Sequence, residues 1–251
     1  MNITLDIETI PAQRPDVIAE IREVKESELQ AAIAAVKPPA TYKKPESIEE
    51  WMKSEAPTVI SKLKSAAEEE IDAAYRKTGL DGAYGQVCVI GFALDDDEPS
   101  AFFSPDDEQS VLQSFNMAMG RINQSQFVTV IGHNVSAFDL RFLTQRYIVN
   151  GIRPNSVVAR AAQAKPWESD KVFDTMVQWA GVGNRVKLDK LCKALGIETP
   201  KGDINGANVW DYVKAGDIAL VADYCVKDVI ATREVFKRMS FNSAQMLKKA
   251  A

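Results

Sequence analysis

The stretch Asn2-Ile3-Thr4-Leu5-Asp6-Ile7-Glu8-Thr9 near the start of the chain combines a strand pattern with two carboxylates. Apolar and polar residues alternate over residues 2–7, which predicts a buried first β-strand. Side chains two positions apart on a strand point to the same face of the sheet, so Asp6 and Glu8 should lie side by side. By itself Asp-x-Glu-Thr is a weak motif, and an exposed charge pair at a strand end is the alternative interpretation.

Two further acidic motifs lie far along the chain. Asp139 ends the stretch Gly132-His-Asn-Val-Ser-Ala-Phe-Asp, which follows the apolar run 127–131 and comes where a helix begins. Tyr224 and Asp228 are four residues apart, so a helix places them on one face. Each motif has a structural alternative: helix capping for Asp139, and a half-buried Tyr224 beside a solvent-edge Asp228. Their joint occurrence favours a shared site.

A shared site of this kind would suit phosphodiester hydrolysis, which needs charge stabilisation at both the attacking and the leaving oxygen. Two divalent cations ~3.5–4 Å apart provide it, and Mg²⁺ prefers carboxylate and water oxygens. Asp6, Glu8, Asp139 and Asp228 supply such oxygens, with Asp6 able to bridge both cations. The Tyr224 hydroxyl could position the attacking water.

Composition excludes several other classes of enzyme. The single histidine, His133, rules out sites that need two histidine ligands. Neither a G-x-x-x-x-G-K-[ST] phosphate loop nor a G-x-G-x-x-G fingerprint is present, and a G-x-S-x-G nucleophile elbow is also missing. Cys88, Cys192 and Cys225 form no C-x-x-C pair, which indicates reduced thiols in a cytosolic protein. The net charge of -5 argues mildly against a protein that coats nucleic acid through bulk positive charge.

The 251 residues, 46% of them hydrophobic, suit a single domain over residues 1–251 with an insertion. Strand patterns occupy residues 86–94, 100–104, 127–131 and 172–174. Helices are expected from 105–108 onward, near 139, over 188–195 up to Gly196, and from about 217 to 239. This order predicts an α/β domain with a mixed sheet.

Residues 12–79 differ from the rest and predict a helical insertion between the first two strands. The segment is rich in Glu, Lys and Ala, with breaks at Pro38-Pro39, Pro45 and Pro57. Ser47-Ile48-Glu49-Glu50 fits a capping box that begins one helix. Tyr42, Lys43 and Lys44 could line the path of a nucleic-acid strand, or the insertion could be a solvated decoration. The sequence leaves both open.

The three acidic motifs together resemble those of DEDD-type 3′-5′ exonucleases, in the branch that carries Tyr in the third motif. In the His branch a histidine precedes the last Asp by five residues, and here that position is Asp223. The chain looks closest to DNA-polymerase-B-like proofreading exonucleases that occur as stand-alone bacterial and phage proteins. Further stretches support the likeness over nearly the whole chain: 42–45, 85–91, 173–176, 188–196 and 203–209.

This resemblance implies a ribonuclease-H-like core, a five-stranded mixed sheet flanked by helices. It implies Asp6, Glu8, Asp139 and Asp228 as ligands of two Mg²⁺ or Mn²⁺ ions, and Tyr224 as the residue that orients water. The substrate would be a single-stranded or frayed DNA 3′ end, with 5′-mononucleotides as products. Residues that would contact it include Thr9, Asn134, Phe138, Tyr42 and Lys43.

Other residues and partners follow from the same likeness. The family does not make Asp174 a ligand, so we interpret it as a helix cap, and His133 as a support of its loop. A polymerase or repair complex acting in trans is the expected protein partner. The expected location is the cytoplasm, with no membrane association.

Three alternatives stay open at this point. An exoribonuclease of the same superfamily would share the metal site, which does not read the sugar. A non-catalytic nucleic-acid-binding or partner-docking domain could keep the fold. An endonuclease of the wider ribonuclease-H-like group would cut substrates with blocked 3′ ends.

Overall fold

A five-stranded mixed sheet in the order β3-β2-β1-β4-β5 forms the centre of the computed structural model, which describes residues 1–122, 127–200 and 202–241. The strands are β1 (Asn2–Ile10), β2 (Gln86–Leu94), β3 (Ser100–Phe103), β4 (Thr129–Gly132) and β5 (Val172–Asp174). β1 pairs antiparallel with β2 and parallel with β4, so it is the central strand. The predicted α/β class with a mixed five-stranded sheet is confirmed.

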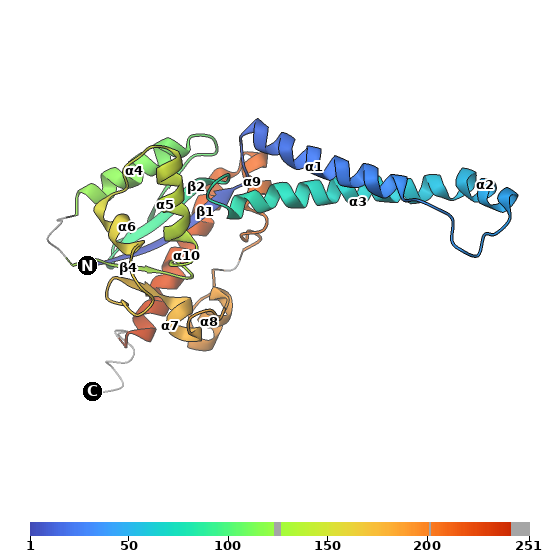
Figure 1. Cartoon of the computed structure of the whole chain (residues 1–251). Coiled ribbons are helices and arrows are strands. Elements are labelled where there is room, and N and C mark those ends of the chain that lie inside the picture. The colour runs from blue at the N-terminus through green and yellow to red at the C-terminus, as the bar shows by residue number, and fades with distance from the viewer. Residues whose placement is uncertain (123–126, 201, 242–251) are drawn as a thin grey trace.

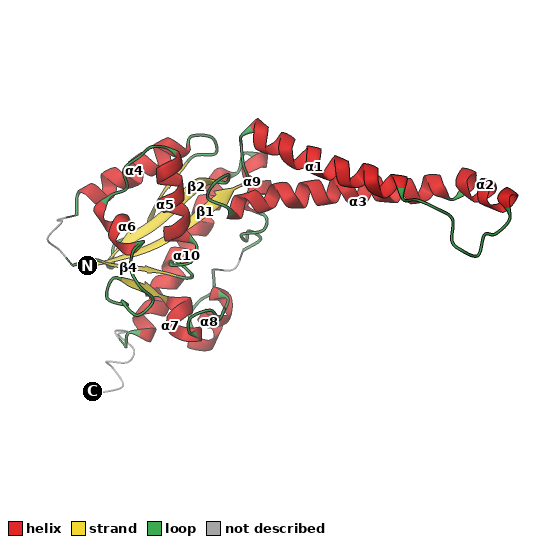
Figure 2. Cartoon of the chain, in the orientation of Figure 1, coloured by secondary structure: helices red, strands yellow, loops and turns green. Residues whose placement is uncertain are grey.

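Helices cover both faces of this sheet (Figures 1 and 2). One layer holds α4 (Glu108–Gly120), α5 (Asp139–Val149) and α6 (Ser156–Ala161). The other holds α7 (Thr175–Ala180), α8 (Leu188–Leu195), α9 (Val209–Ala215) and α10 (Ile218–Met239). Within the described residues, none of the helices is both long and apolar enough to span a bilayer.

The central strand packs against helices on both of its faces. Leu5 and Ile7 pack into the cluster under α4 and α5, whereas Ile10 packs with residues of α9 and α10. Because successive strand residues face opposite layers, Asp6 and Glu8 lie on the α10 side. The fold therefore turns both carboxylates toward the last long helix.

Most element boundaries match those expected from the sequence. β2, β5 and α8 have the predicted ranges, and α8 ends at Gly196 in the left-handed conformation, with φ of 67°. β4 begins at Thr129 rather than at Phe127, whose side chain is 64% exposed. The three cysteines are buried and free, as expected.

Residues between β1 and β2 form a helical arm that projects far from the body (Figure 1). It consists of α1 (Pro15–Ala34), α2 (Pro45–Ser54) and α3 (Ala56–Lys77), followed by the short 3-10 turn η1 (Thr78–Leu80). The capping-box prediction at 47–50 is wrong: α2 begins at Pro45, and Lys44 precedes it without a side-chain cap. Proline favours the first helical position because its φ is already helical and it has no N–H to satisfy.

The arm is held firmly where it joins the body. Arg76 of α3 donates from both terminal nitrogens to the Asp211 carboxylate of α9, at 3.1 and 2.7 Å. Next to this pair, Tyr75 packs edge-on against Trp210, with ring centroids 6.2 Å apart. Side chains from two different helices therefore fix the direction in which the arm leaves the sheet.

A buried ion pair fixes α5 against α4 and the start of β2. Arg146 donates to both carboxylate oxygens of Glu108, at 2.8 and 2.7 Å, and also to the Gly82 carbonyl. Glu108 in turn accepts from the Val87 amide. Such a pair is stable only when its remaining hydrogen-bonding groups are satisfied. Here these hydrogen bonds join α5, which carries Asp139, to α4 and to residues 82–87.

Candidate active site

Asp6 and Glu8 lie near the end of β1, where the pairing with β2 becomes irregular. Asp6 is paired with Gly91, and the register shifts directly after Glu8. Bulges of this kind often re-aim side chains beside active sites. Glu8 is buried and Asp6 is half-buried, so the chain has placed two acids where charge is costly.

Gly91 lets α10 come close to these two acids. A Cβ at this position would lie 2.7 Å from the Cys225 sulfur and 3.2 Å from Val229. The Cys225 thiol itself lies 3.3 Å from Asp6 Oδ2. The small residue on β2 thus sets the distance between Asp6 and the helix that carries Tyr224.

Asp139 reaches the cluster from the first turn of α5. It does not cap that helix, which is preceded by Phe138. Instead, Oδ1 of Asp139 accepts from the Ile7 amide at 3.0 Å. The pairing of β1 with β4 covers only Asn2 to Thr4. Ile7 lies beyond this pairing, so its amide donates to the Asp139 carboxylate and not to a carbonyl of β4.

Tyr224 and Asp228 approach from α10, and the electrostatics show that all the acids share one environment. Burial raises the pKa of Asp6 and of Glu8 well above their ordinary values, and the neighbouring carboxylates raise both further. Burial also raises the pKa of Asp139 to about 7, opposed by backbone N–H groups. The pKa of Asp228 rises to about 6 through burial, opposed by a hydrogen bond from Tyr224.

Tyr224 keeps its proton in this setting. Burial raises the pKa of its hydroxyl, and the nearby Asp228, Glu8 and Asp6 raise it further. A phenol of this kind can hold a water molecule by hydrogen bonding but cannot act as a base at neutral pH. The described residues therefore bring all five predicted catalytic side chains into one group.

The carboxylates suit divalent cations. Ligand atoms of Asp6, Glu8 and Cys225 lie within 4.8 Å of one another. Within the described ranges, Asp6, Glu8, Asp139 and Asp228 form no salt bridge. Crowded, buried carboxylates without a cationic side chain are strongly disfavoured unless they bind protons or metal ions. Oxygen donors of this kind fit Mg²⁺ or Mn²⁺.

Asp174 organises the loop that presents Asp139. It caps α7 as expected, accepting from Met176 and Val177. Its two oxygens also accept from the amides of Asn134 and Ser136, each at 3.0 Å. The sequence indicated only the cap; these two longer-range bonds depend on β4 and β5 lying side by side.

His133 supports the neighbouring segments. Its Nε2 donates to the Val186 carbonyl at 2.8 Å, and Nδ1 lies 2.9 Å from the Thr175 hydroxyl. Burial lowers its pKa, which favours the neutral ring, in which Nδ1 accepts from Thr175. Both ring nitrogens are thereby used in holding the loop.

Three predicted substrate contacts lie close to the acids in sequence. Thr9 donates its hydroxyl hydrogen to the Gly79 carbonyl at 2.7 Å, so it also ties the arm to β1. Asn134 has a left-handed backbone, with φ of 65°. Phe138 is half-buried and packs on Phe142, with centroids 5.5 Å apart.

Tyr42 and Lys43 lie elsewhere. They belong to the loop between α1 and α2, at the far end of the arm (Figure 1). The 20 residues of α1 extend about 30 Å at ~1.5 Å per residue. Tyr42 and Lys43 therefore lie far from the acids, and their role along the path of a nucleic-acid strand stays a prediction.

A polar pocket beside Phe138 was not anticipated from the sequence. It has a volume of about 210 Å³, and its walls include Leu80, Arg141 and Gln145. Arg141 is exposed and lies two residues after Asp139. The only signal in the sequence would have been Arg141, a basic residue in the first turn of a helix that begins with an acid.

Comparison with known proteins agrees with this geometry. Residues 87–251 match a family described as a predicted 3′-5′ exonuclease related to the exonuclease domain of PolB. The chain belongs to this family. The PolB-related family match begins after β1 and the arm, so Asp139, Tyr224 and Asp228 lie inside it and Asp6 and Glu8 lie outside.

A similarity to a solved structure covers nearly the whole of this chain. The family B DNA polymerase from the hyperthermophilic archaeon Pyrobaculum calidifontis superposes with a TM-score of 0.51, at 13% identity. The match covers 96% of this chain and only 24% of the polymerase. At this identity it shows the fold alone. The sequence matches no curated protein.

Proposed function

We propose that this member of the PolB-related family is a metal-dependent 3′-5′ exonuclease of the DEDD type, in its Tyr branch. It removes 5′-mononucleotides from single-stranded or frayed DNA 3′ ends. The observation that carries the proposal is the convergence of four carboxylates from β1, α5 and α10 beside the Tyr224 hydroxyl.

Each side chain has a defined part in the proposed reaction. Asp6, Glu8, Asp139 and Asp228 would hold the divalent cations, while Oδ1 of Asp139 also accepts from the Ile7 amide. When bound, two such cations would activate water and stabilise the leaving 3′ oxygen. Tyr224, protonated, orients the water in line with the phosphorus.

Substrate contacts follow from the surface next to Asp139. Phe138 offers an aromatic face for base stacking, and the exposed Arg141 offers a charge for a phosphate. Asn134 and Thr9 border the same end of the sheet. We do not extend this role to the arm, whose tip is too far from the acids.

Incubation of 5′-labelled single-stranded DNA with magnesium tests the reaction directly. A ladder that shortens from the 3′ end, and that a chelator stops, is expected. Asp6→Ala should abolish it, whereas the matched variant Asp223→Ala, which changes an exposed acid on α10, should not. Activity of Asp6→Ala within a few-fold of the unmodified protein would refute the assigned ligands.

The same assay separates the remaining possibilities. Faster digestion of RNA than of DNA oligomers would make the protein an exoribonuclease. Cleavage of oligomers with blocked 3′ ends would make it an endonuclease. Calorimetry that detects no binding of magnesium or manganese would indicate a non-catalytic domain.

A further inference from the structure

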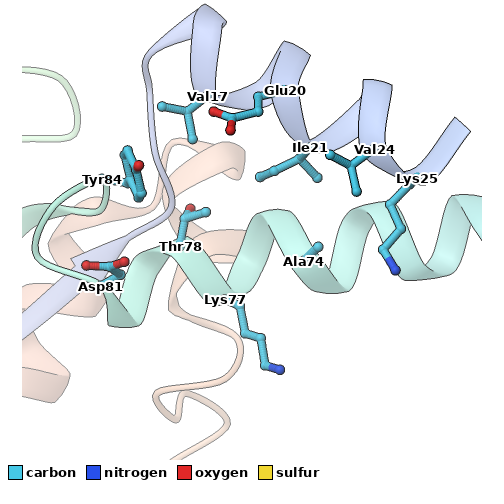
Figure 3. Close-up of a pocket in the computed structure, with 10 residues that line it drawn as sticks. All are labelled: Val17, Glu20, Ile21, Val24, Lys25, Ala74, Lys77, Thr78, Asp81 and Tyr84. Carbon is cyan, nitrogen blue, oxygen red and sulfur yellow. The ribbon is translucent and has the colours of Figure 1, made fainter. Parts of the chain in front are cut away.

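The arm has an apolar groove at its root, where it joins the body. The groove has a volume of about 380 Å³ and lies between α1 and α3. Figure 3 shows Val17, Ile21 and Val24 of α1 facing Ala74 of α3, with Tyr84 at one end. Val24 is 52% exposed. This volume lies within the ~300–1,000 Å³ range typical of binding pockets.

The root is acidic. In residues 14–28 and 68–81 acidic side chains outnumber basic ones. Several of the basic ones are already paired within the arm or with α9: Arg14 with Asp16, Lys25 with Glu28 and Glu70, and Arg76 with Asp72 and Asp211. Glu20, at the groove, and Glu23 form no salt bridge among the described residues.

The tip loop, residues 35–44, has the opposite character. It contains Lys37, Lys43 and Lys44 and no acidic residue. These lysines form no salt bridge within the described part of the chain, and Tyr42 beside them is 39% exposed. Next to the tip loop, Met52 of α2 is 44% exposed. The tip loop therefore offers cations and the Tyr42 ring, whereas Glu46, Glu49 and Glu50 lie beyond it on α2. The root offers carboxylates and an apolar groove.

We propose that two copies of this chain associate through their arms, laid antiparallel, with the tip loop of each copy in the root groove of the other. Root and tip of one arm are about 30 Å apart, so a two-fold axis through the middle of the arms engages both ends at once. Tyr42 enters the groove between Val24 and Ala74, and Lys43 and Lys44 face Glu20 and Glu23.

The area available fits this partner. A pair of helices about 30 Å long and about 20 Å wide presents roughly 600 Å² on one face. Two arms would therefore bury about 1,200 Å², the lower limit for a specific interface. A nucleic acid fits less well, because it would lie along an acidic root.

Sedimentation velocity or light scattering over a range of protein concentrations tests the proposal. The expected mass is twice the 27.7 kDa of one chain. Raising the salt from about 0.1 M to about 1 M shortens the Debye length from ~10 to ~3 Å and should favour the monomer. A monomer at every concentration in low salt overturns the proposal.

Charge reversal identifies the surfaces. Lys43→Glu with Lys44→Glu reverses the tip, and Glu20→Lys with Glu23→Lys reverses the root. Either variant alone should dimerise at least about tenfold more weakly, because like charges would face each other. Mixing the two variants should restore the dimer, since the reversed tip then meets the reversed root. Misfolding would give no such rescue.

The control is Arg121→Glu with Arg153→Glu, which reverses two exposed charges on the body and should leave the dimer unchanged. Dimers that persist in both arm variants, or fail to reform on mixing, overturn the proposal. So does a tip variant that stays dimeric but binds single-stranded DNA more weakly, which would make the tip a nucleic-acid contact. The mass readout is independent of hydrolysis and of the proposed function.

Discussion

Asp228→Asn should stabilise the cation-free protein above neutral pH while abolishing hydrolysis. The carboxyl of Asp228 has a pKa raised from 3.8 to about 6, first by burial. A raised folded-state pKa means that the group opposes folding once it is ionised. Asparagine has nearly the same shape, carries no charge, and can still accept from Tyr224.

The size of the effect follows from the pKa. At ~1.36 kcal/mol per pKa unit, a rise from 3.8 to about 6 corresponds to ~3 kcal/mol. This value is an upper limit, because Asp228 is partly exposed and solvent screens its charge. For a chain of this length ~1 kcal/mol is ~2–4 °C in Tm, so the gain is at most about 6–12 °C. It develops between about pH 4 and pH 6 and is absent below that window, because the carboxyl is then protonated in both states.

Thermal unfolding in chelator, at about pH 4 and about pH 8, measures this difference. Asp223→Asn on the same helix is the matched control and should change stability by no more than about 0.5 kcal/mol. Added magnesium should stabilise the unmodified protein and have little effect on Asp228→Asn. Loss of stability in Asp228→Asn at the higher pH, or a gain equal at both pH values, would refute the idea that burial penalises the ionised carboxyl of Asp228.

Three other substitutions test the geometry. Tyr224→Phe should lower turnover more than DNA binding, measured by single-turnover kinetics and anisotropy; equal effects would mean that the hydroxyl holds substrate instead. Gly91→Ala should push α10 away from β1, cost ~1–3 kcal/mol and slow hydrolysis, whereas Gly120→Ala, whose Cβ would meet nothing within 4 Å, should be harmless in both assays. Asp174→Ala should cost ~2–5 kcal/mol because several partly buried backbone amides lose their acceptor, and Asp174→Asn should recover part of both stability and activity; a full loss in each would argue for direct metal contact.

The strands and the acidic positions could be predicted because their signals are local. β2 is a continuous apolar run, and Gly196 ends α8 because glycine readily adopts a left-handed φ. The acidic residues could be recognised because each lies in a local strand or helix pattern that fixes the direction of its side chain. Residues 87–251 match the PolB-related exonuclease family, which agrees with the exonuclease family expected from the sequence.

What could not be predicted depends on contacts between distant segments. Gly91 matters only because Cys225 packs on it, and Asp174 binds the Asn134 loop only because β5 lies beside β4. Ser47 looked like a helix start, but Pro45 begins the helix two residues earlier. The sequence also did not show that the insertion projects as an arm, with Tyr42 in the loop at its far end.

The arm leaves the sheet after Ile10 and returns before Gln86, and these two residues are neighbours on adjacent strands. Topologically it is therefore an enlarged hairpin turn, whose length does not alter the strand pairing on either side. A longer, shorter or differently charged arm would leave the acidic cluster in place. The contacts that the arm makes can thus change without changing the proposed reaction.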